Sequence, residues 1–319
     1  MTGFAEVPVL VTGGAGFIGS HLVEALVARG AAVRVIDDLS TGRRENLAGL
    51  GSKIEFLEGS LVDRRVCEAA CRGRRLVFHQ AALGSVPRSV RDPGATIEVN
   101  VGGTTHLLAA ARDAGVERVV YASSSSVYGD SPEMPRREGR EGRALSPYAL
   151  SKQMGEQLAD VFGRCYGLQL VGLRYFNVYG PRQRPDGPYA AVVPRFFAAF
   201  GSGERPTIHG DGRQTRDFTY VEDAVSANLL AARAPERACG KVYNVGRGTA
   251  TTIGRLAELI AAAVGSDLAP LHGPPRDGDV RHSHADTRAA AAELGFEARF
   301  DLARGLARTC EAPASDLPP

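Results

Sequence analysis

Residues 9–22, VLVTGGAGFIGSHL, decide the fold of this chain. The run VLVT has the composition of a short buried strand, and glycines follow it at Gly13, Gly16 and Gly19. We expect Gly13 to make the tight turn, Gly16 to let a pyrophosphate approach the backbone, and Gly19 to let helix and strand pack closely. The helix that follows, to about Arg29, would offer the free N–H groups of its first turn to that pyrophosphate. The stretch therefore predicts a dinucleotide site.

Short apolar strands and amphipathic helices alternate through the first half of the chain. The strand-like segments are VPVLVT, AAVRVID, KIEFLE, RLVFHQ and RVVYAS, and further helices are expected at about residues 62–71 and 95–114. Apolar runs between helices indicate a parallel sheet that is covered on both faces. We predict an α/β fold: a Rossmann-type doubly wound parallel sheet with a smaller C-terminal substrate-binding lobe.

The pattern changes after LQLVGLRY, where Gly and Pro begin to interrupt the chain. We expect residues 1–175 to form the dinucleotide-binding domain, and a strand and helix near residues 218–250, including VYNVG, to return to it. Residues 176–310 would form mainly the substrate lobe. The polar, Pro-rich residues 311–319 are predicted to be a disordered tail.

The composition excludes several classes of protein. In 319 residues, 38 Lys and Arg balance 36 Asp and Glu, and no basic block suggests a nucleic-acid partner. No apolar run approaches the roughly 20 residues that span a bilayer, and the N-terminus lacks a signal-peptide pattern. Five cysteines and the histidines fit neither a disulfide framework nor a metal site, and we expect Cys67 and Cys71 to pack in a core. These features favour a cytoplasmic protein without a membrane partner.

The second expected strand ends in Val35-Ile36-Asp37-Asp38. An acidic side chain at this position can accept hydrogen bonds from the adenine-ribose hydroxyls and would repel a 2′-phosphate. We therefore predict NAD as the cofactor instead of NADP, although the nearby Arg43 and Arg44 argue against a strict preference.

A possible catalytic pair lies in SPYALSK, residues 146–152. Ser146 as N-cap and Pro147 at the first helical position start a helix, so Tyr148 and Lys152, four residues apart, share one face. An ammonium group beside a phenol stabilises the phenolate. We expect Lys152 to lower the pKa of Tyr148 toward the range in which the phenolate can act as a base.

With the glycine turn and the serine run SSSSVYG at residues 123–129, this pair resembles the extended short-chain dehydrogenase/reductase family and, within it, the nucleotide-sugar epimerases. The resemblance covers nearly the whole chain, through TGGAGFIGSHL, DDLSTG, HQAA, EVN, SSSSVYG, SPYALSK, LRYFNVYGPRQRPDG, GDGRQTRDFTYVEDA, YNVG and PRDGD in that order. It implies that Tyr148 is the acid/base, that Lys152 holds the nicotinamide ribose and that Ser124 hydrogen-bonds the reacting hydroxyl. It also implies a tightly bound NAD that is regenerated in each cycle. The cofactor contacts expected in all are Gly13, Gly16, Phe17, Ile18, Gly19, Asp37, Asp38, Ala81, Asn100, Tyr148 and Lys152.

The serine run separates the reactions that occur in this family. The 4,6-dehydratases carry an Asp-Glu pair before V-Y-G, and decarboxylases that make UDP-xylose usually have a glutamate at the place of Ser126. Ser125 and Ser126 are poor proton donors at neutral pH, so elimination and decarboxylation are not favoured. Epimerisation remains: Tyr148 would take the proton of the 4-hydroxyl as the C4 hydride passes to NAD, and the 4-keto sugar would turn over and be reduced on its other face.

The resemblance also implies how a UDP-sugar would be bound. Arg216 and Arg276 would bind the phosphates, with Asn177 reaching the same region and Val193 near the uracil. The loop EGSLVD has Ser60 where relatives often carry an aspartate that contacts adenine, so no firm contact is expected there.

Two groups of residues point to different sugars. Residues 84–89, GSVPRS, which include Arg88, and the stretch YAAVVP resemble epimerases of UDP-N-acetylglucosamine. In contrast, Arg184 of PRQRPD and the ASSSSVYG form of the serine run resemble the uronate 4-epimerases, since Arg184 would attract a C5 carboxylate that Ser125 and Ser126 could solvate. We expect conversion of UDP-glucuronate to UDP-galacturonate, with UDP-N-acetylglucosamine and UDP-glucose as alternatives.

Two other functions stay open, a net 4-ketoreductase that releases its cofactor and a non-catalytic NAD-binding regulator. Regulators on this fold tend to lose the Tyr or the Lys, and both are present here. The family further implies a homodimer formed through the helices at about residues 95–114 and 147–166.

Overall fold

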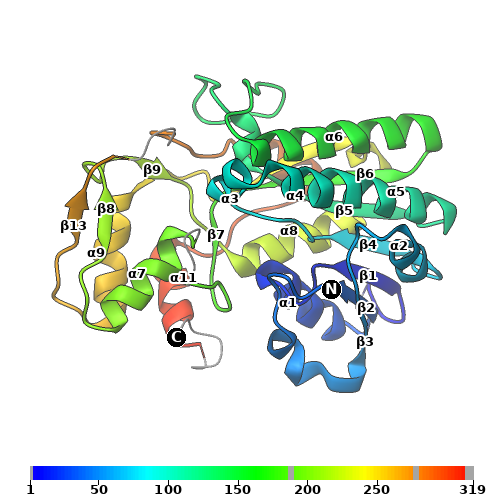
Figure 1. The fold of residues 1–319 in the computed structure, drawn as a ribbon, viewed down its shortest axis with the longest axis horizontal. Coiled ribbons are helices and arrows are strands. Elements are labelled where there is room, and N and C mark those ends of the chain that lie inside the picture. The colour runs from blue at the N-terminus through cyan, green and yellow to red at the C-terminus, as the bar shows by residue number, and fades with distance from the viewer. Residues whose placement is uncertain (1–2, 186–189, 276–279, 313–319) are drawn as a thin grey trace.

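The structure is a computed structural model that describes residues 3–185, 190–275 and 280–312. Its centre is a seven-stranded sheet in the order β11-β6-β5-β4-β1-β2-β3, in which every pair of neighbours is parallel. The strands are β1 (Pro8–Thr12), β2 (Ala32–Asp37), β3 (Ile54–Glu58), β4 (Leu76–His79), β5 (Arg118–Ser124), β6 (Gln169–Tyr175) and β11 (Lys241–Val245). The predicted doubly wound α/β fold is confirmed (Figure 1).

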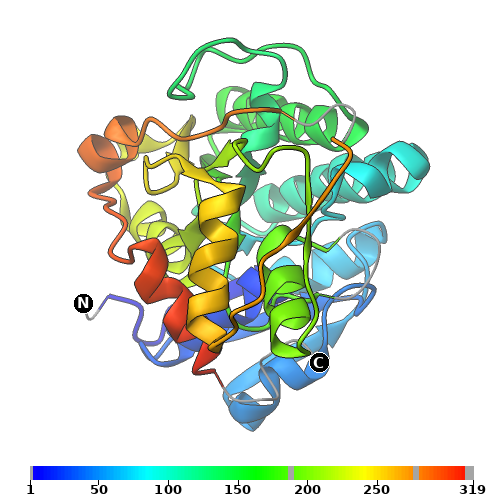
Figure 2. The same ribbon diagram turned by 90° about the vertical axis from the view of Figure 1, so that its left-hand side faces the viewer.

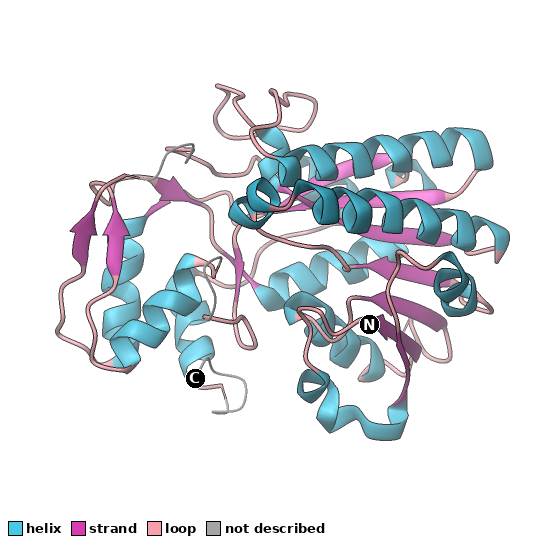
Figure 3. Ribbon diagram, viewed as in Figure 1, coloured by secondary structure: helices cyan, strands magenta, loops and turns pink. Residues whose placement is uncertain are grey.

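Hydrophobic cores lie on both faces of this sheet, and helices cover both (Figure 3). Side chains alternate along β1, so Val9 and Val11 face one core and Leu10 faces the other. The first core is covered by α1 (Phe17–Val27) and α8 (Val221–Arg233), and the second by α2 (Arg64–Cys71), α5 (Thr104–Asp113) and α6 (Pro147–Tyr166). Cys67 and Cys71 are buried in the second core, as expected, and burial raises the pKa of each thiol to about 12.

The smaller lobe has a core of its own. Figure 2 faces this lobe, with α9 (Ile253–Val264) between α7 (Val192–Gly201) and α11 (Leu302–Cys310). Short strand pairs complete the lobe: β8 (Thr207–His209) with β13 (Leu271–Gly273), and β9 (Thr215–Arg216) with β12 (Thr251–Thr252). A further pair, β7 (Val178–Tyr179) with β10 (Thr219–Tyr220), links the lobe to the sheet domain.

The chain crosses between the two parts more than once. After α7 and β8 in the lobe it returns to the sheet domain as α8 and β11, and α10 (Arg288–Leu294) packs against β11. The carboxyl ends of β1, β4, β5 and β6 consequently face the lobe, which is where an open α/β sheet binds its ligand. Within the residues that the structure describes, no helix combines the length and the apolar character needed to cross a bilayer.

The helix expected at residues 95–114 is more complex than the sequence pattern suggests. It consists of α4 (Pro93–Ile97), a π-helical turn η2 (Glu98–Gly103) and α5, and it follows a short helix α3 (Val86–Arg91). The turn includes Asn100, whose side chain binds both the N–H and the C=O of Leu83. A π-helical turn is often found at a functional site, and this one lies beside the cavity described next.

Candidate active site

The turn between β1 and α1 is packed so closely that it requires glycine at two positions. Gly13 has a φ of 65°, and a Cβ there would lie 2.7 Å from the backbone of Ala81. A Cβ on Gly19 would lie 2.1 Å from the carbonyl oxygen of Gly13. Around Gly16 the only near atom is that same oxygen, at 3.2 Å, so the backbone stays open toward the cavity. This cradle has the shape and the free helix N-terminus that a dinucleotide pyrophosphate needs.

A cavity of about 310 Å³ lies over this turn and collects residues from the carboxyl ends of six strands, β1 to β6. The expected cofactor residues that line it are Gly13, Gly16, Phe17, Ile18, Gly19, Asp37, Asp38, Ala81, Tyr148 and Lys152. Asn100 is the one expected contact that does not line this cavity. The sequence motifs are therefore brought together although they are up to 139 positions apart.

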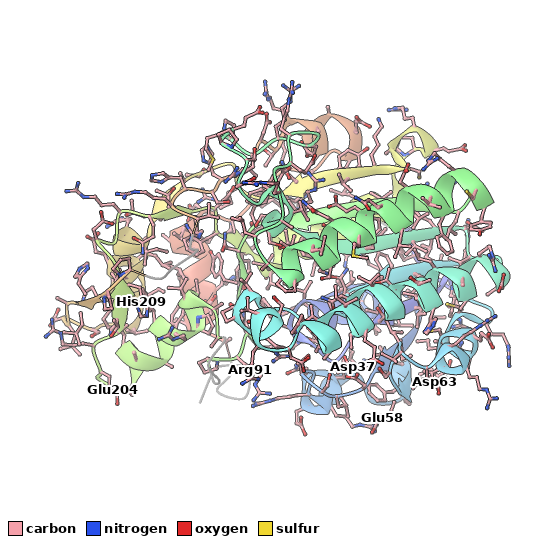
Figure 4. All side chains as sticks on the ribbon, turned by 45° about the horizontal axis from the view of Figure 1, so that its top comes forward. Asp37, Glu58, Asp63, Arg91, Glu204 and His209 are labelled. Carbon is pink, nitrogen blue, oxygen red and sulfur yellow. The ribbon has the colours of Figure 1, made fainter. Side chains whose placement is uncertain are left out.

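Asp37, at the end of β2, connects the glycine turn to the loop after β2. Its Oδ2 accepts from the N–H of Ala15 and its Oδ1 from that of Leu39, both at 2.9 Å. Burial raises the pKa of Asp37, and these two hydrogen bonds oppose the shift. In Figure 4, Asp37 lies with Glu58 in the sheet domain, away from Glu204 and His209 of the lobe. Each oxygen retains a lone pair that could receive a ribose hydroxyl.

Tyr148 and Lys152 lie on the first two turns of α6, which starts as the sequence predicts. The Oγ of Ser146 accepts from the N–H of Ala149 at 3.1 Å, and Pro147 is the first helical residue. The Tyr148 hydroxyl is hydrogen-bonded to Ser124, the last residue of β5. Lys152 Nζ donates to the carbonyl oxygen of Ala122 at 2.9 Å.

The pKa of Tyr148 is raised in this structure, whereas the sequence led us to expect a lower value. Burial raises it, and the hydrogen bond with Ser124 only partly opposes this. Lys152 does not supply the expected effect here because its ammonium group donates to Ala122. Burial also lowers the pKa of Lys152 to about 8, opposed by the charge of Glu156. The phenol is neutral at pH 7 in this state, and NAD⁺ would bring a positively charged nicotinamide that favours the phenolate.

The four serines of the run have different environments. Ser123 Oγ donates to Glu156 at 2.5 Å, whereas Ser124 Oγ accepts from the N–H of Ser126 at 3.2 Å. Ser125 and Ser126 start the short helix η3 (Ser125–Tyr128), and neither lines the cavity at Tyr148. Within the described residues, Ser126 Oγ is buried without a hydrogen-bond partner.

Asn100 lies behind the cavity. In addition to holding Leu83, it donates to Ser151 Oγ at 3.0 Å, and Ser151 in turn donates to the carbonyl oxygen of Tyr148 at 2.8 Å. Leu83 itself lines the cavity. Asn100 thus connects the loop after β4 to the first turn of α6, a role that the motif EVN does not reveal.

Sequence reasoning also did not name several cavity residues as contacts. They are Ile36, Ser40, Thr41, Gly59, Ser60, Leu61, Gln80, Ala82, Leu83, Gly84, Val99, Ala122, Ser123 and Tyr175. Several of them fall within motifs that the sequence analysis quoted, such as DDLSTG, HQAA, EVN and SSSSVYG, without having been singled out as contacts. His79 of HQAA is buried between Thr12 Oγ1 at 2.8 Å and Thr104 Oγ1 at 2.9 Å, and burial lowers the pKa of His79 to about 3. The neutral ring supports Thr12, which accepts from the N–H of Ala81.

Of the residues expected to bind the sugar nucleotide, those that the structure describes do not line the cavity at Tyr148. Asn177 follows β6 and donates to the carbonyl oxygen of Asp217 at 3.1 Å, Arg216 lies in β9, and Arg88 lies on α3. Arg184 is exposed, and Arg276 lies outside the described residues.

Val193 is buried in the core of the smaller lobe. The expected contact of Val193 with uracil stays a prediction. Among the described residues, no group of three or more His, Cys, Asp or Glu side chains is placed to hold a metal ion.

Comparisons with known proteins agree with this geometry. The model of the NAD dependent epimerase/dehydratase family matches residues 9–246. A UDP-glucose 4-epimerase of Mycolicibacterium smegmatis is 43% identical over 306 residues, 95% of this chain and 97% of that protein. A solved UDP-N-acetylglucosamine 4-epimerase from Methanobrevibacter ruminantium has a TM-score of 0.92 at 39% identity, covering 96% of this chain and 98% of its own. MoeE5, solved with UDP-glucuronic acid and NAD, has a TM-score of 0.86 at 39% identity, covering 95% and 98%.

Proposed function

The chain belongs to the NAD-dependent epimerase/dehydratase family, and we propose that it inverts C4 of a UDP-hexose whose C6 is an uncharged hydroxymethyl group. At the coarser level it is an NAD-dependent UDP-sugar 4-epimerase. The observation that carries the reaction is the hydrogen bond between Tyr148 and Ser124, beside Lys152, in one cavity with the glycine turn. UDP-glucose and UDP-N-acetylglucosamine are the first substrates to test.

Each residue of the site has a separate task in this reaction. NAD supplies the hydride acceptor for C4. Tyr148 takes the proton from the 4-hydroxyl and later returns it. The sugar is not oxidised overall because the hydride lost from C4 is also returned to C4. Ser124 hydrogen-bonds the same sugar oxygen. Lys152 would hold the nicotinamide ribose, as the resemblance to the epimerases implies.

The serines after Ser124 limit what else can happen to the oxidised sugar. Elimination of water needs an additional acid and base near C5 and C6. Ser125 and Ser126 cannot supply them at neutral pH, and Ser126 Oγ is buried. The 4-keto sugar is therefore reduced again, which favours epimerisation over dehydration.

The choice of a neutral sugar is supported by the relatives and by the position of Arg184. The relative that is 43% identical is named for UDP-glucose, and a solved structure at a TM-score of 0.92 is named for UDP-N-acetylglucosamine. Arg184, the residue that favours a uronate, is exposed and does not line the cavity at Tyr148.

UDP-glucuronate is the second candidate. The guanidinium of Arg184 would attract the C5 carboxylate of a uronate. In addition, MoeE5, which is 39% identical to this chain, is solved with UDP-glucuronic acid.

A direct comparison of substrates tests both candidates. The purified chain is incubated with UDP-glucose, UDP-N-acetylglucosamine or UDP-glucuronate, and the C4 epimers are followed by proton NMR. We expect kcat/KM for at least one neutral sugar to exceed that for UDP-glucuronate by about tenfold or more. The opposite order would assign the chain to the uronate. In that case Arg184→Gln would lower turnover of UDP-glucuronate and leave any turnover of the neutral sugars unchanged.

A further inference from the structure

Glu156 lies on the face of α6 that carries the reacting pair. It follows Lys152 by four residues and Tyr148 by eight, so the three side chains occupy successive turns on one side of the helix. Unlike the other two, Glu156 does not line the cavity. Its carboxylate binds the two strands on which α6 packs.

Both oxygens of Glu156 are used in these contacts. Arg174 Nε donates to Oε1 at 2.8 Å and one terminal nitrogen donates to Oε2 at 2.7 Å, which is the strong paired geometry of arginine and a carboxylate. Ser123 Oγ donates to Oε1 at 2.5 Å. Ser123 and Arg174 lie opposite each other in the pairing of β5 with β6. Glu156 therefore connects α6 to both strands at one point.

Three consecutive residues of β5 contact three residues of α6. The Ala122 carbonyl accepts from Lys152, Ser123 donates to Glu156, and Ser124 is hydrogen-bonded to Tyr148. Ser123 lies between Ala122 and Ser124 in the strand. The contact of Glu156 with Ser123 therefore fixes the position of α6 along β5, and with it the positions of Tyr148 and Lys152.

Glu156 also balances charge in a buried region. Arg174 forms ion pairs with both Glu156 and Glu141, so with Lys152 the cluster contains two cations and two carboxylates. The two carboxylates differ in burial, since the Glu156 side chain is 13% exposed and that of Glu141 is 27% exposed. Of the two, only Glu156 acts on Lys152, where its charge opposes the effect of burial.

The other titratable groups near this cluster do not replace Glu156, because none of them brings a second negative charge to Lys152. Tyr148 on α6 and Tyr121 on β5 have a raised pKa through burial and are neutral. His79 on β4 has a pKa lowered to about 3 by burial and is neutral as well. Asp160, one turn beyond Glu156, is paired with Arg164.

We propose that Glu156 is a positioning residue for the reaction: through Ser123 and Arg174 it fixes α6 on β5 and β6, and its negative charge balances that of Lys152. The proposal rests on the assignment of Tyr148 and Lys152 as the reacting pair. Glu156 does not line the cavity, so it would act only through these neighbours.

The test compares Glu156→Gln with Glu141→Gln. Each variant removes one carboxylate from Arg174, but only the first removes the charge that acts on Lys152. The chain has only three lysines, Lys53, Lys152 and Lys241, so the amine of Lys152 can be titrated by NMR after labelling lysine with ¹³C at Cε. This readout does not depend on any substrate, so it stays informative even if the proposed reaction is wrong.

We expect Glu156→Gln to lower the titration midpoint of Lys152 by about one pH unit or more, and Glu141→Gln to change it by less than about 0.3. The decline of kcat at alkaline pH should shift with it in the first variant only. Equal shifts in both variants, or a uniform loss of kcat with an unchanged titration of Lys152, would overturn the charge role.

Glu156→Asp tests the geometric role and serves also if Glu156→Gln does not fold. It keeps the charge but shortens the side chain by one methylene group, so the contacts with Ser123 and Arg174 are stretched. We expect kcat to fall about tenfold at every pH while the midpoint of Lys152 stays near that of the unmodified chain. An unchanged kcat in this variant would overturn the positioning role.

Discussion

At Tyr148, burial and hydrogen bonding act in opposite directions on one phenol. Burial keeps it protonated, while Ser124 favours the phenolate, and the structure holds the residue as an acid that can become a base when a further positive charge enters the cavity. Lys152, with a pKa lowered to about 8, sits one turn away. The reactivity of the site therefore depends on charge balance more than on any single side chain.

Replacing Tyr148 by Phe tests this directly. The variant keeps the ring in place but removes the proton acceptor for the 4-hydroxyl, so we expect kcat for epimerisation to fall by about 10²- to 10⁴-fold. Tyr166→Phe, which removes an exposed hydroxyl from the same helix, is the control and should keep full activity. Epimerisation at the full rate by Tyr148→Phe would remove Tyr148 from the mechanism.

Asp37 should decide between the two dinucleotides. Asp37→Asn removes the charge that would repel a 2′-phosphate, so we expect the preference for NAD over NADP in binding titrations to weaken by about tenfold. Because its amide nitrogen would face the N–H of Ala15 or Leu39, the variant should also be less stable by about 1–3 kcal/mol. An unchanged preference would place the discrimination elsewhere, for example at Arg43 or Arg44.

Single residues were predicted well where a motif is contiguous and poorly where the contact is long-range. The glycine turn and Tyr148 with Lys152 are local patterns, and the structure places them at one cavity. Leu83 also lines it, but it belongs to none of the motifs that the sequence analysis quoted. The reason is that Leu83 is held by Asn100, 17 positions away, and such pairings are set by packing.

Among the elements, α8 depends on an arginine from the start of β5. One terminal nitrogen of Arg118 donates to the carbonyls of Ala231, Ala232 and Ala234 at the end of α8, where helix carbonyls lack partners. The same guanidinium donates to Gln169 of β6. Arg118 thus ties one helix to two strands.

Arg118→Met should therefore destabilise the whole sheet domain. It leaves buried carbonyl groups without donors, and we expect the free energy of unfolding in urea to fall by about 2–4 kcal/mol. Arg112→Met, which removes an exposed pair with Asp113, is the matched control and should change it by less than about 1 kcal/mol. Equal effects of the two variants would show that the Arg118 contacts do not support the helix.

The main elements of the sheet domain were predictable because their patterns are strong. Apolar runs such as VLVT and RVVYAS became β1 and β5, and the Ser-Pro start of α6 is where the sequence placed it. The π-helical turn at Glu98–Gly103 was not predicted, since six residues are too few for hydrophobic spacing to distinguish it from an α-helix. It depends on the side chain of Asn100 bonding to a distant loop.

At the scale of the whole molecule, α6 carries apolar residues on its outer side. Leu150 is 45% exposed and Val161 is 41% exposed, and their spacing of eleven residues places them on one face. We propose that two copies associate through α5 and α6, as the resemblance to the epimerases implies.

Sedimentation equilibrium tests this association. The unmodified chain should be a dimer at micromolar concentration, and the double variant Leu150→Arg/Val161→Arg should be a monomer, because charges would be buried without partners. Val86→Arg, at an exposed site on α3, is the control and should remain dimeric. A monomeric unmodified chain would contradict the proposal.

The central claim is that C4 is inverted by removing a hydride and returning the same hydride. The most direct measurement supplies the chain, without added cofactor, with UDP-glucose, or with whichever of the three sugars it converts, labelled with deuterium at C4. The C4 epimer is then analysed by NMR in ordinary water. The account predicts an epimer that retains essentially all of the deuterium at C4, with no NADH released. Replacement of the label by hydrogen from solvent, or accumulation of a 4-keto sugar with free NADH, would contradict it.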